Sequence, residues 1–264
     1  MIEYLHAILL GIVEGLTEFL PVSSTAHLLI AEEVLGFAGP PGKVFPVVIQ
    51  LGAVLSVVVV YWRKFWDATV GLPSDPWARH FAIGLVIAFL PSAAMGAAFH
   101  GLIKEVLFSV PVIAGALIAG GIAILVIERI VPPARFSESD QLPWRKCLEI
   151  GCCQVLSLIP GISRSGATIL GGMLLGVERK AAAEFTFFLA VPTMLGAFVY
   201  DLYKNWDGIT MNGGLIIAIG FVVSFVAAYA VVRTFIAFIS RYGFAPFAYY
   251  RIALGTLIFG VLYL

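Results

Sequence analysis

Apolar segments, each about as long as a membrane is thick, recur along almost the whole of this chain. Six of them are uninterrupted and cover residues 45–62, 81–100, 110–130, 183–203, 214–235 and 244–263. A helix that crosses a bilayer needs about 20 predominantly apolar residues. The sequence therefore predicts an all-α integral membrane protein with several transmembrane helices.

The charge content agrees with this class and excludes one kind of partner. Only 12% of the 264 residues are charged, whereas soluble domains carry about 25%. Lys and Arg balance Asp and Glu, so the net charge is zero, and no basic run is present. We therefore expect membrane lipids as surroundings and no nucleic-acid partner. The sequence leaves a homo-oligomer open.

Two further apolar stretches are each broken near their middle. Residues 2–20 stop at Pro21 and resume at about 24–35, and residues 146–159 stop at Pro160-Gly161 and resume at about 165–175. Proline ends a helix because it lacks an N–H and clashes with the preceding turn, and serine or threonine caps a new one. Each stretch, 2–35 and 146–176, thus predicts a re-entrant helical hairpin. Its non-helical tip is tolerated in a membrane only if it is buried or lines a cavity.

The two halves of the chain repeat at an offset of 140 residues. Gly11 matches Gly151 and Glu14 matches Gln154; Thr25 matches Ser165 after a one-residue slip at the prolines. Each half is a re-entrant hairpin plus three spans, and three is odd, so the second copy is inverted. This predicts a first repeat over 1–131, a cytoplasmic linker over 132–145 and a second repeat over 146–264. Inverted repeats of broken helices place a binding site at their interface.

The loops between the segments differ in positive charge. One set of loops carries eleven Lys and Arg residues, and the other set carries only Lys43, Lys104 and Lys204. Cytoplasmic loops are the positively charged ones. We therefore expect both termini and the first hairpin on the outer side, with the site open to that side.

The first break holds a pair of carboxylates, Glu14 and Glu18. Residues four apart share one face of a helix, and two carboxylates held close repel each other unless a cation lies between them. Oxygen ligands suit Mg²⁺ or Ca²⁺, so the pair predicts a divalent cation site. The alternative is a polar helix end that faces water.

Hydroxyl groups and a histidine follow directly. Ser23, Ser24 and Thr25 open the second half-helix, whose free N–H groups form an anion site. Their hydroxyls could cap the helix, bind phosphate or act as a nucleophile. His27 is a candidate general acid or base, or it is simply a hydrogen-bonded side chain.

The second break carries an arginine at membrane depth, where a charge costs about 2.5–3.5 kcal/mol and therefore indicates function. Arg164 stands among Ser163, Ser165 and Thr168. A guanidinium grips phosphate oxygens at two points, so the cluster predicts phosphate binding. The alternative is a structural partner for Glu14 or Glu18. Arg251, inside the last span, also needs a partner, and the sequence does not identify it.

These two motifs resemble the signature motifs of the undecaprenyl-pyrophosphate phosphatase family of the bacitracin-resistance type. The resemblance rests on Glu14-Gly-Leu-Thr-Glu-Phe-Leu-Pro-Val-Ser-Ser-Thr-Ala-His27 and Pro160-Gly-Ile-Ser-Arg-Ser-Gly-Ala-Thr168 and covers essentially the whole chain. It implies a bacterial inner-membrane enzyme with a divalent cation. The enzyme would hydrolyse undecaprenyl pyrophosphate to undecaprenyl phosphate and so recycle the lipid carrier of cell-wall synthesis.

The resemblance also implies residue roles. The catalytic positions fall on Glu14, Glu18, Ser24, His27 and Arg164. The supporting phosphate contacts fall on Ser23, Thr25, Ser163, Ser165 and Thr168. Ala26 departs from the family, which usually has glycine there, so close approach of the backbone to phosphate is less certain at this point.

Two mechanisms and one other function stay open. Ser24 is a candidate nucleophile, with Glu18 or His27 accepting its proton, and a metal-activated water is the rival attacker. A transporter or flippase of a phosphorylated polyprenyl lipid is the alternative function, because broken helices in inverted repeats are typical of transporters.

Overall fold

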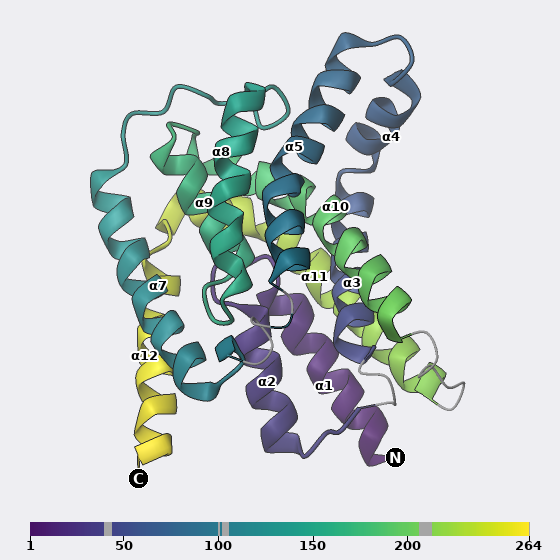
Figure 1. Ribbon diagram of the computed structural model, residues 1–264, viewed down its shortest axis with the longest axis vertical. Coiled ribbons are helices and arrows are strands. Elements are labelled where there is room, and N and C mark those ends of the chain that lie inside the picture. The colour runs from purple at the N-terminus through teal and green to yellow at the C-terminus, as the bar shows by residue number, and fades with distance from the viewer. Residues whose placement is uncertain (40–43, 100, 102–105, 206–212, 264) are drawn as a thin grey trace.

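The computed structural model describes residues 1–39, 44–99, 101, 106–205 and 213–263 of the chain. Within these residues the chain forms eleven α-helices and one short 3₁₀ helix (Figure 1). The only β-type pairing among them is an isolated bridge between Phe136 and Val177. The predicted all-α class is confirmed.

The helices follow the predicted order. The first half contains α1 (Ile2–Thr17), α2 (Ser24–Leu35), α3 (Phe45–Val60), α4 (Trp62–Gly71), α5 (Pro76–Ala98) and α7 (Val110–Ile130). The second half contains α8 (Trp144–Val155), the 3₁₀ helix η2 (Leu156–Leu158), α9 (Arg164–Leu174), α10 (Arg179–Asn205), α11 (Gly214–Tyr242) and α12 (Ala245–Tyr263). Both predicted breaks are present, between α1 and α2 and between η2 and α9.

Four helices in the described part of the chain, α5, α7, α10 and α11, are each long and apolar enough to cross a membrane. The bent pair of α3 and α4 adds a fifth candidate. The sixth predicted span corresponds to α12, whose apolar part, Ala245–Val261, lies near the lower end of the about 17–25 residues that span a bilayer. The chain is thus a multi-pass membrane protein with four or five candidate spans.

One helix was not predicted from the sequence. The predicted span 45–62 ends at Val60, where the chain bends by 80° into α4. Trp62 and Trp66 are exposed on α4, and Arg63 and Lys64 lie between them. Mixed aromatic and basic residues suit the membrane–water interface rather than its interior, which explains why the span stops there.

Other boundaries moved by a few residues. The α5 helix begins at Pro76 because the Asp75 carboxylate accepts a hydrogen bond from the Trp77 N–H at 2.9 Å, which caps the helix before the predicted start. The α8 helix begins at Trp144, inside the predicted linker. Lys43, Lys104 and the side chain of Lys204, on which the predicted orientation partly rests, lie outside the described residues.

The helices of each break pack against a helix of the other half. The α1 helix lies along α11, and α8 lies along α5. Glycines allow both approaches: a Cβ atom at Gly15 would collide with the carbonyl oxygen of Ser224, and one at Gly151 with that of Ala88. Small residues bring helices close together in membranes, where packing rather than hydrophobicity drives association.

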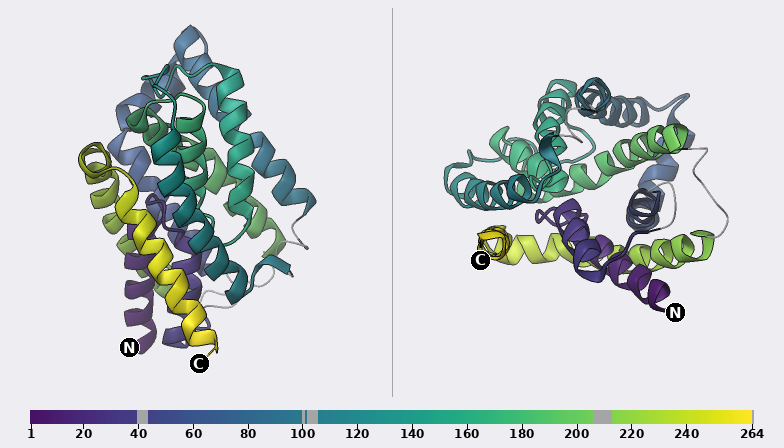
Figure 2. Two further views of the ribbon diagram at one scale, coloured as in Figure 1. Left: turned by 90° about the vertical axis from the view of Figure 1, so that its left-hand side faces the viewer. Right: turned by 60° about the horizontal axis from the view of Figure 1, so that its bottom comes forward.

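The ends of the chain lie on one side of the molecule. Both termini are at the lower end in Figure 1 and in the left view of Figure 2, and α4 with the start of α5 is at the opposite end. The two breaks lie between these ends, so the polar motifs are at an intermediate depth of the helix bundle.

Candidate active site

Both breaks end in a serine with a left-handed backbone. Ser23 has φ 72° and Ser163 has φ 78°, and they are the N-cap residues of α2 and α9. Such a conformation costs a residue with a side chain about 1–3 kcal/mol, and it persists where surrounding contacts impose it, often at functional sites. The two breaks therefore share one local geometry although they lie 140 residues apart in the chain.

Arg251 of α12 holds both breaks in place. Its side chain is buried, and a guanidinium has five N–H groups to satisfy. The Nη1 group donates to the carbonyl oxygens of Pro21 in the first break and Ile162 in the second, both at 2.9 Å. The remaining acceptors are the carbonyls of Gly161, Ala116 and Leu117. The sequence did not identify a partner for Arg251, and the structure shows that its partners are main-chain carbonyl groups.

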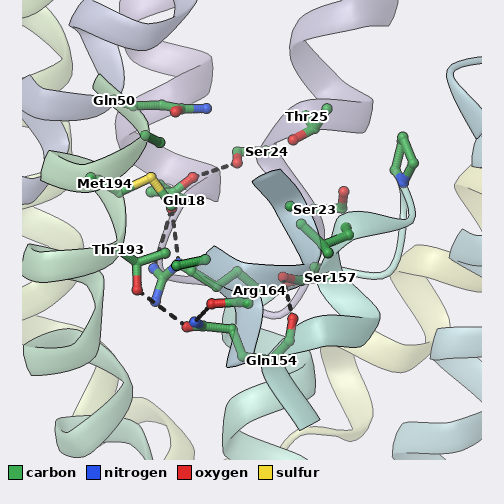
Figure 3. Close-up of a pocket in the computed structure, with 18 of the residues that line it drawn as sticks. Glu18, Ser23, Ser24, Thr25, Gln50, Gln154, Ser157, Arg164, Thr193 and Met194 are labelled. Carbon is green, nitrogen blue, oxygen red and sulfur yellow. Dashed lines mark hydrogen bonds and ion pairs between the residues drawn. The ribbon is translucent and has the colours of Figure 1, made fainter. Parts of the chain in front are cut away.

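Glu18 is the side chain at which the two motifs meet (Figure 3). Its Oε2 accepts a hydrogen bond from Ser24 Oγ at 2.5 Å. Its Oε1 accepts from Arg164 Nη2 at 3.2 Å, an ion pair between the two halves of the chain. One carboxylate thus connects a hydroxyl group and a guanidinium: Glu18 is the C-cap residue of α1, Ser24 is the first residue of α2 and Arg164 is the first residue of α9.

Arg164 is fixed on one side and open on the other. Besides the bonds of Nη2 and Nε to Glu18, Nη1 donates to the Thr186 carbonyl oxygen at 3.0 Å. The guanidinium carbon lies 6.0 Å from the centre of the Phe19 ring. These bonds among the described residues use three of its five N–H groups. The other two are available to a ligand, so pairing with Glu18 and binding of phosphate are compatible.

A cavity of about 560 Å³ opens beside these groups. Its polar lining in the described residues comes from Glu18, Arg164 and the hydroxyl and amide residues near them (Figure 3). These residues are Ser23, Ser24, Thr25, Gln50, Ser92, Gln154, Ser157, Ser163 and Thr193. Small-molecule sites commonly occupy about 300–1,000 Å³ and combine apolar walls with a few polar groups. The cavity is large enough for a pyrophosphate group and part of an attached chain.

Glu14 is not among the residues that line this cavity. It is completely buried, and neither carboxylate oxygen has a hydrogen-bond partner among the described residues. It lies one helical turn before Glu18. No group of three His, Cys, Asp and Glu side chains that could hold a metal occurs in the described part of the chain. A divalent cation at Glu14 and Glu18 would therefore complete its coordination with other oxygens. Such a site fits Mg²⁺, which commonly uses one or two carboxylates plus phosphate oxygens.

The predicted hydroxyl residues divide into two groups. Ser23, Ser24, Thr25 and Ser163 line the cavity. Ser165 and Thr168 are buried outside its lining and donate to the carbonyl oxygens of Leu20 (2.7 Å) and Arg164 (2.9 Å). The Ser165 bond joins the second break to the first.

His27 does not line the cavity. Its Nδ1 lies 2.7 Å from the Ser23 carbonyl oxygen and its Nε2 lies 2.7 Å from the Tyr250 hydroxyl, with the two rings stacked. A carbonyl only accepts, so Nδ1 carries a proton and donates to it. The structure therefore places His27 beside the backbone of Ser23 rather than beside the Ser24 hydroxyl.

Two amide residues line the site and were not among the predicted site residues. Gln50 of α3 contributes its side chain to the cavity, and Gln154 donates to Ser92 Oγ at 2.5 Å. Gln154 had a signal in the sequence, because it matches Glu14 in the repeat. No signal in the sequence indicated Gln50, because it lies in a segment without a motif that is typical of an ordinary membrane span.

Comparison with known proteins shows similarity to one family over almost the whole chain. Residues 7–257 match the model of the family described as bacitracin resistance protein BacA. The chain is 53% identical over 253 residues to undecaprenyl-diphosphatase 2 of Paramagnetospirillum magneticum, covering 96% of this chain and 97% of that protein. It is 47% identical over 265 residues to the undecaprenyl-diphosphatase of Caulobacter vibrioides, covering 100% and 99%.

Proposed function

The chain belongs to the bacitracin resistance protein BacA family and is an undecaprenyl-diphosphatase, and we propose that its reaction takes place in the cavity between the two helical breaks. The observation that supports this location is the single carboxylate of Glu18, which accepts hydrogen bonds from Ser24 and Arg164. A nucleophile, a base and a cation for phosphate thereby meet at one wall of the cavity.

In the first step, Ser24 Oγ attacks the terminal phosphorus of undecaprenyl pyrophosphate. The Oγ–P bond forms, the bond from phosphorus to the bridging oxygen breaks, and undecaprenyl phosphate leaves. The proton of Ser24 passes to Glu18 Oε2, which already accepts its hydrogen bond. Glu18 then gives this proton to the departing oxygen of undecaprenyl phosphate and is ionised again. A serine is a weak nucleophile unless a neighbouring base activates it in this way.

In the second step, water attacks the phosphoserine. Ionised Glu18 takes one proton of the water, the Oγ–P bond breaks, inorganic phosphate is released, and Glu18 returns the proton to Ser24 Oγ. Direct attack by water on the terminal phosphorus, again with Glu18 as base, is the rival route. The orientation of Ser24 toward Glu18 favours the route through the serine.

The anionic phosphates are held by Arg164 and by the starts of two helices. The two N–H groups of Arg164 that the described bonds leave available would bind phosphate oxygens. First-turn N–H groups have no partner inside their helices, and the positive end of a helix dipole favours an anion. At the start of α9 the Gly166 N–H donates to Ser163 Oγ, so the other first-turn N–H groups would contact the phosphate there. Preorganised donors of this kind stabilise charge in phosphoryl transfer. Ser23, Thr25 and Ser163 line the same cavity and would add hydroxyl contacts.

A divalent cation, Mg²⁺ or Ca²⁺, is part of the proposal. Glu14 and Glu18 would hold it, because Glu14 carries two buried oxygens for which the described residues supply no hydrogen-bond partner. When bound, the cation would neutralise charge on the pyrophosphate. Ser165, Thr168 and His27, which were also predicted from the sequence, would act by holding the two breaks in their observed geometry.

The fold supports an inverted-topology repeat. Residues 1–131 would form the first repeat, 132–145 the cytoplasmic linker and 146–264 the second repeat. At the 140-residue offset α1 corresponds to α8 and α5 to α11, and the packing of α1 on α11 then corresponds to that of α8 on α5. Each half would consist of a re-entrant hairpin and three spans.

The orientation rests on charge. Arg63 and Lys64 lie on α4, and both termini lie at the end of the molecule opposite α4 (Figure 1). By the positive-inside rule the α4 end is cytoplasmic. We place the protein in the bacterial inner membrane, with the cavity open to the periplasmic side, where undecaprenyl pyrophosphate would enter it.

Phosphate release by the purified protein tests this function. The protein in detergent, supplied with undecaprenyl pyrophosphate and Mg²⁺, is expected to release inorganic phosphate, and EDTA is expected to abolish the release. Folded protein that releases none would contradict the proposal. A lipid-flipping assay in vesicles would then test the transporter alternative.

A further inference from the structure

Gln50 of α3 lines the cavity, and the described residues provide no hydrogen-bond partner for its side chain. The other polar side chain of α3, Ser56, donates to the Ala53 carbonyl oxygen of its own helix at 2.6 Å. Polar side chains at membrane depth either pair with protein groups or mark the path of a ligand. Because Gln50 pairs with no described residue, its position favours contact with a ligand.

The second amide residue of the cavity, Gln154, is used differently. Its Nε2 donates to Ser92 Oγ at 2.5 Å, and its Oε1 accepts from Thr193 Oγ1 at 3.5 Å. These bonds join α8 to α5 and α10, which is a structural use of an amide. Gln50 carries the same two N–H donors and one carbonyl oxygen, and in the described part of the chain they stay available to whatever occupies the cavity.

Gln50 and Arg164 lie on opposite sides of the reacting groups. In the view of Figure 3, the Gln50 side chain is above the hydrogen bond between Ser24 and Glu18, and Arg164 is below it. All four residues line the same cavity. A phosphate that Ser24 Oγ attacks would therefore have a guanidinium on one side and an amide on the other.

The packing of α3 on α11 fixes the place of Gln50. The carbonyl oxygen of the preceding residue, Ile49, accepts a hydrogen bond from Ser224 Oγ at 2.8 Å. Two residues after Gln50, a Cβ atom at Gly52 would collide with the carbonyl oxygen of Phe221. Donors that are held in place before the reaction stabilise charge in the transition state without the cost of rearrangement. A helix fixed in this way is a suitable support for such a donor.

We propose that Gln50 is a further substrate-binding residue, whose side-chain N–H donates to a non-bridging oxygen of the terminal phosphate during its transfer to Ser24. A neutral donor suits this position. A lysine or arginine there would pair with the Glu18 carboxylate and compete with Ser24 for it, whereas an amide binds phosphate without such competition. The inference rests on the proposed function, since it assigns a contact to the phosphate that is cleaved.

Gln50→Met tests this contact because methionine keeps the length of the side chain and removes both polar groups. Gln141→Met is the matched control, since Gln141 is exposed and lies outside the cavity lining. With farnesyl pyrophosphate and saturating Mg²⁺, Gln50→Met is expected to lower kcat/KM at least about tenfold, as the loss of a hydrogen bond to a charged group does. The control is expected to keep the wild-type value. A Gln50→Met variant that is folded by thermal unfolding and keeps wild-type kcat/KM would overturn the proposal.

The two products of the reaction show which phosphate Gln50 contacts. Inorganic phosphate corresponds to the terminal phosphate, and farnesyl phosphate corresponds to the phosphate that stays on the prenyl chain. In Gln50→Met the inhibition constant of inorganic phosphate is expected to rise at least about tenfold, and that of farnesyl phosphate is expected to stay unchanged. Equal changes, or a rise for farnesyl phosphate alone, would overturn the assignment to the terminal phosphate.

Gln50→Glu separates a donor to phosphate from a ligand of the divalent cation. A glutamine carbonyl can bind such a cation, and a carboxylate would bind it at least as well, but a carboxylate repels phosphate. We expect kcat/KM of Gln50→Glu to be lower than that of Gln50→Met. Wild-type activity together with a lower Mg²⁺ concentration for half-maximal activity would show that Gln50 binds the cation and would overturn the proposal.

A measurement on the unaltered protein does not depend on any variant folding. The chain has only three glutamines, Gln50, Gln141 and Gln154, so ¹⁵N labelling of glutamine side chains gives a simple amide spectrum. Saturating inorganic phosphate with Mg²⁺ is expected to move a Gln50 amide proton downfield and to leave Gln141 unchanged. Gln50 signals that do not move in phosphate-saturated protein would overturn the contact. Failure of the wild type to hydrolyse any prenyl pyrophosphate would instead overturn the proposed function.

Discussion

Arg164 of the second half and Glu18 of the first half form a buried ion pair, with Arg164 Nη2 3.2 Å from Glu18 Oε1. Neither motif contains both residues, so the pair exists only when the two breaks meet. Because the same carboxylate also accepts the Ser24 hydroxyl hydrogen bond, the pair joins phosphate binding to activation of the nucleophile. The predictions below follow from this arrangement.

Glu18→Gln is expected to lower kcat about 10²–10⁴-fold, the usual contribution of a positioned acid or base. The amide keeps the shape of the side chain but does not accept the Ser24 proton. KM is expected to change much less, since Arg164 still faces the cavity. Steady-state phosphate release at saturating Mg²⁺ measures both constants. A variant with wild-type kcat would show that Glu18 is not the base.

Ser24→Ala distinguishes the two routes of attack. If the serine is the nucleophile, the variant loses turnover, and the wild type quenched in acid carries labelled phosphate on Ser24 when the terminal phosphate of the substrate is radioactive. Ser56→Ala is the matched control, because Ser56 is buried, donates to the Ala53 carbonyl oxygen and lies outside the cavity lining. Intact activity of Ser24→Ala would rule out the covalent route.

Glu14→Gln is expected to weaken the binding of the divalent cation rather than the stability of the fold. The buried carboxylate has no hydrogen-bond partner in the described residues, so its removal leaves no protein group newly unpaired. We expect the Mg²⁺ concentration for half-maximal activity to rise at least about tenfold, within the range seen when a metal site loses a supporting group. Titration of EDTA-treated protein with Mg²⁺ measures the shift. An unchanged titration curve would remove Glu14 from the metal site.

Arg251→Met is expected to destabilise the protein by at least about 3 kcal/mol, since hydrogen bonds to a charged group contribute about 1.5–3 kcal/mol each. Five carbonyl groups, including those of Pro21 and Ile162, lose their donor. Arg251→Lys keeps the charge but has three N–H groups, so its stability should lie between those of the wild type and Arg251→Met. Thermal unfolding in detergent gives the order, and equal Tm values for all three proteins would contradict it.

Much of this architecture could be predicted from the sequence. Proline stops a helix for a local steric reason, at Pro21 and Pro160, and serine starts the next helix, at Ser23 and Ser163. Both breaks can therefore be predicted without knowledge of the tertiary structure. The meeting of Glu18 with Arg164 followed from the repeat, because matching breaks in an inverted repeat face one interface. The pairing of these two residues had been one of the alternatives for Arg164.

The rest depends on contacts between distant segments. His27 follows Ser24 by three residues, yet its ring turns to Tyr250 of α12, which no local pattern encodes. The hydroxyl of Thr168 donates to a carbonyl one turn earlier, a common alternative for a helical threonine. Arg251 donates hydrogen bonds to main-chain carbonyl groups. Every residue carries such a group, so no sequence motif indicates its partners. The bend before α4 likewise reflects where the membrane surface lies.

The most direct test of the central claim is phosphate release by Arg164→Ala, measured with undecaprenyl pyrophosphate and Mg²⁺ beside the wild type and the Ser56→Ala control. If the two breaks form one phosphatase site, removing the guanidinium takes away both the phosphate contact and the partner of Glu18. We expect kcat/KM to fall about 10²–10³-fold, as losses of one donor that stabilises transition-state charge do. We expect thermal unfolding to show that the variant is folded. A folded Arg164→Ala variant within about tenfold of the wild type would contradict the account.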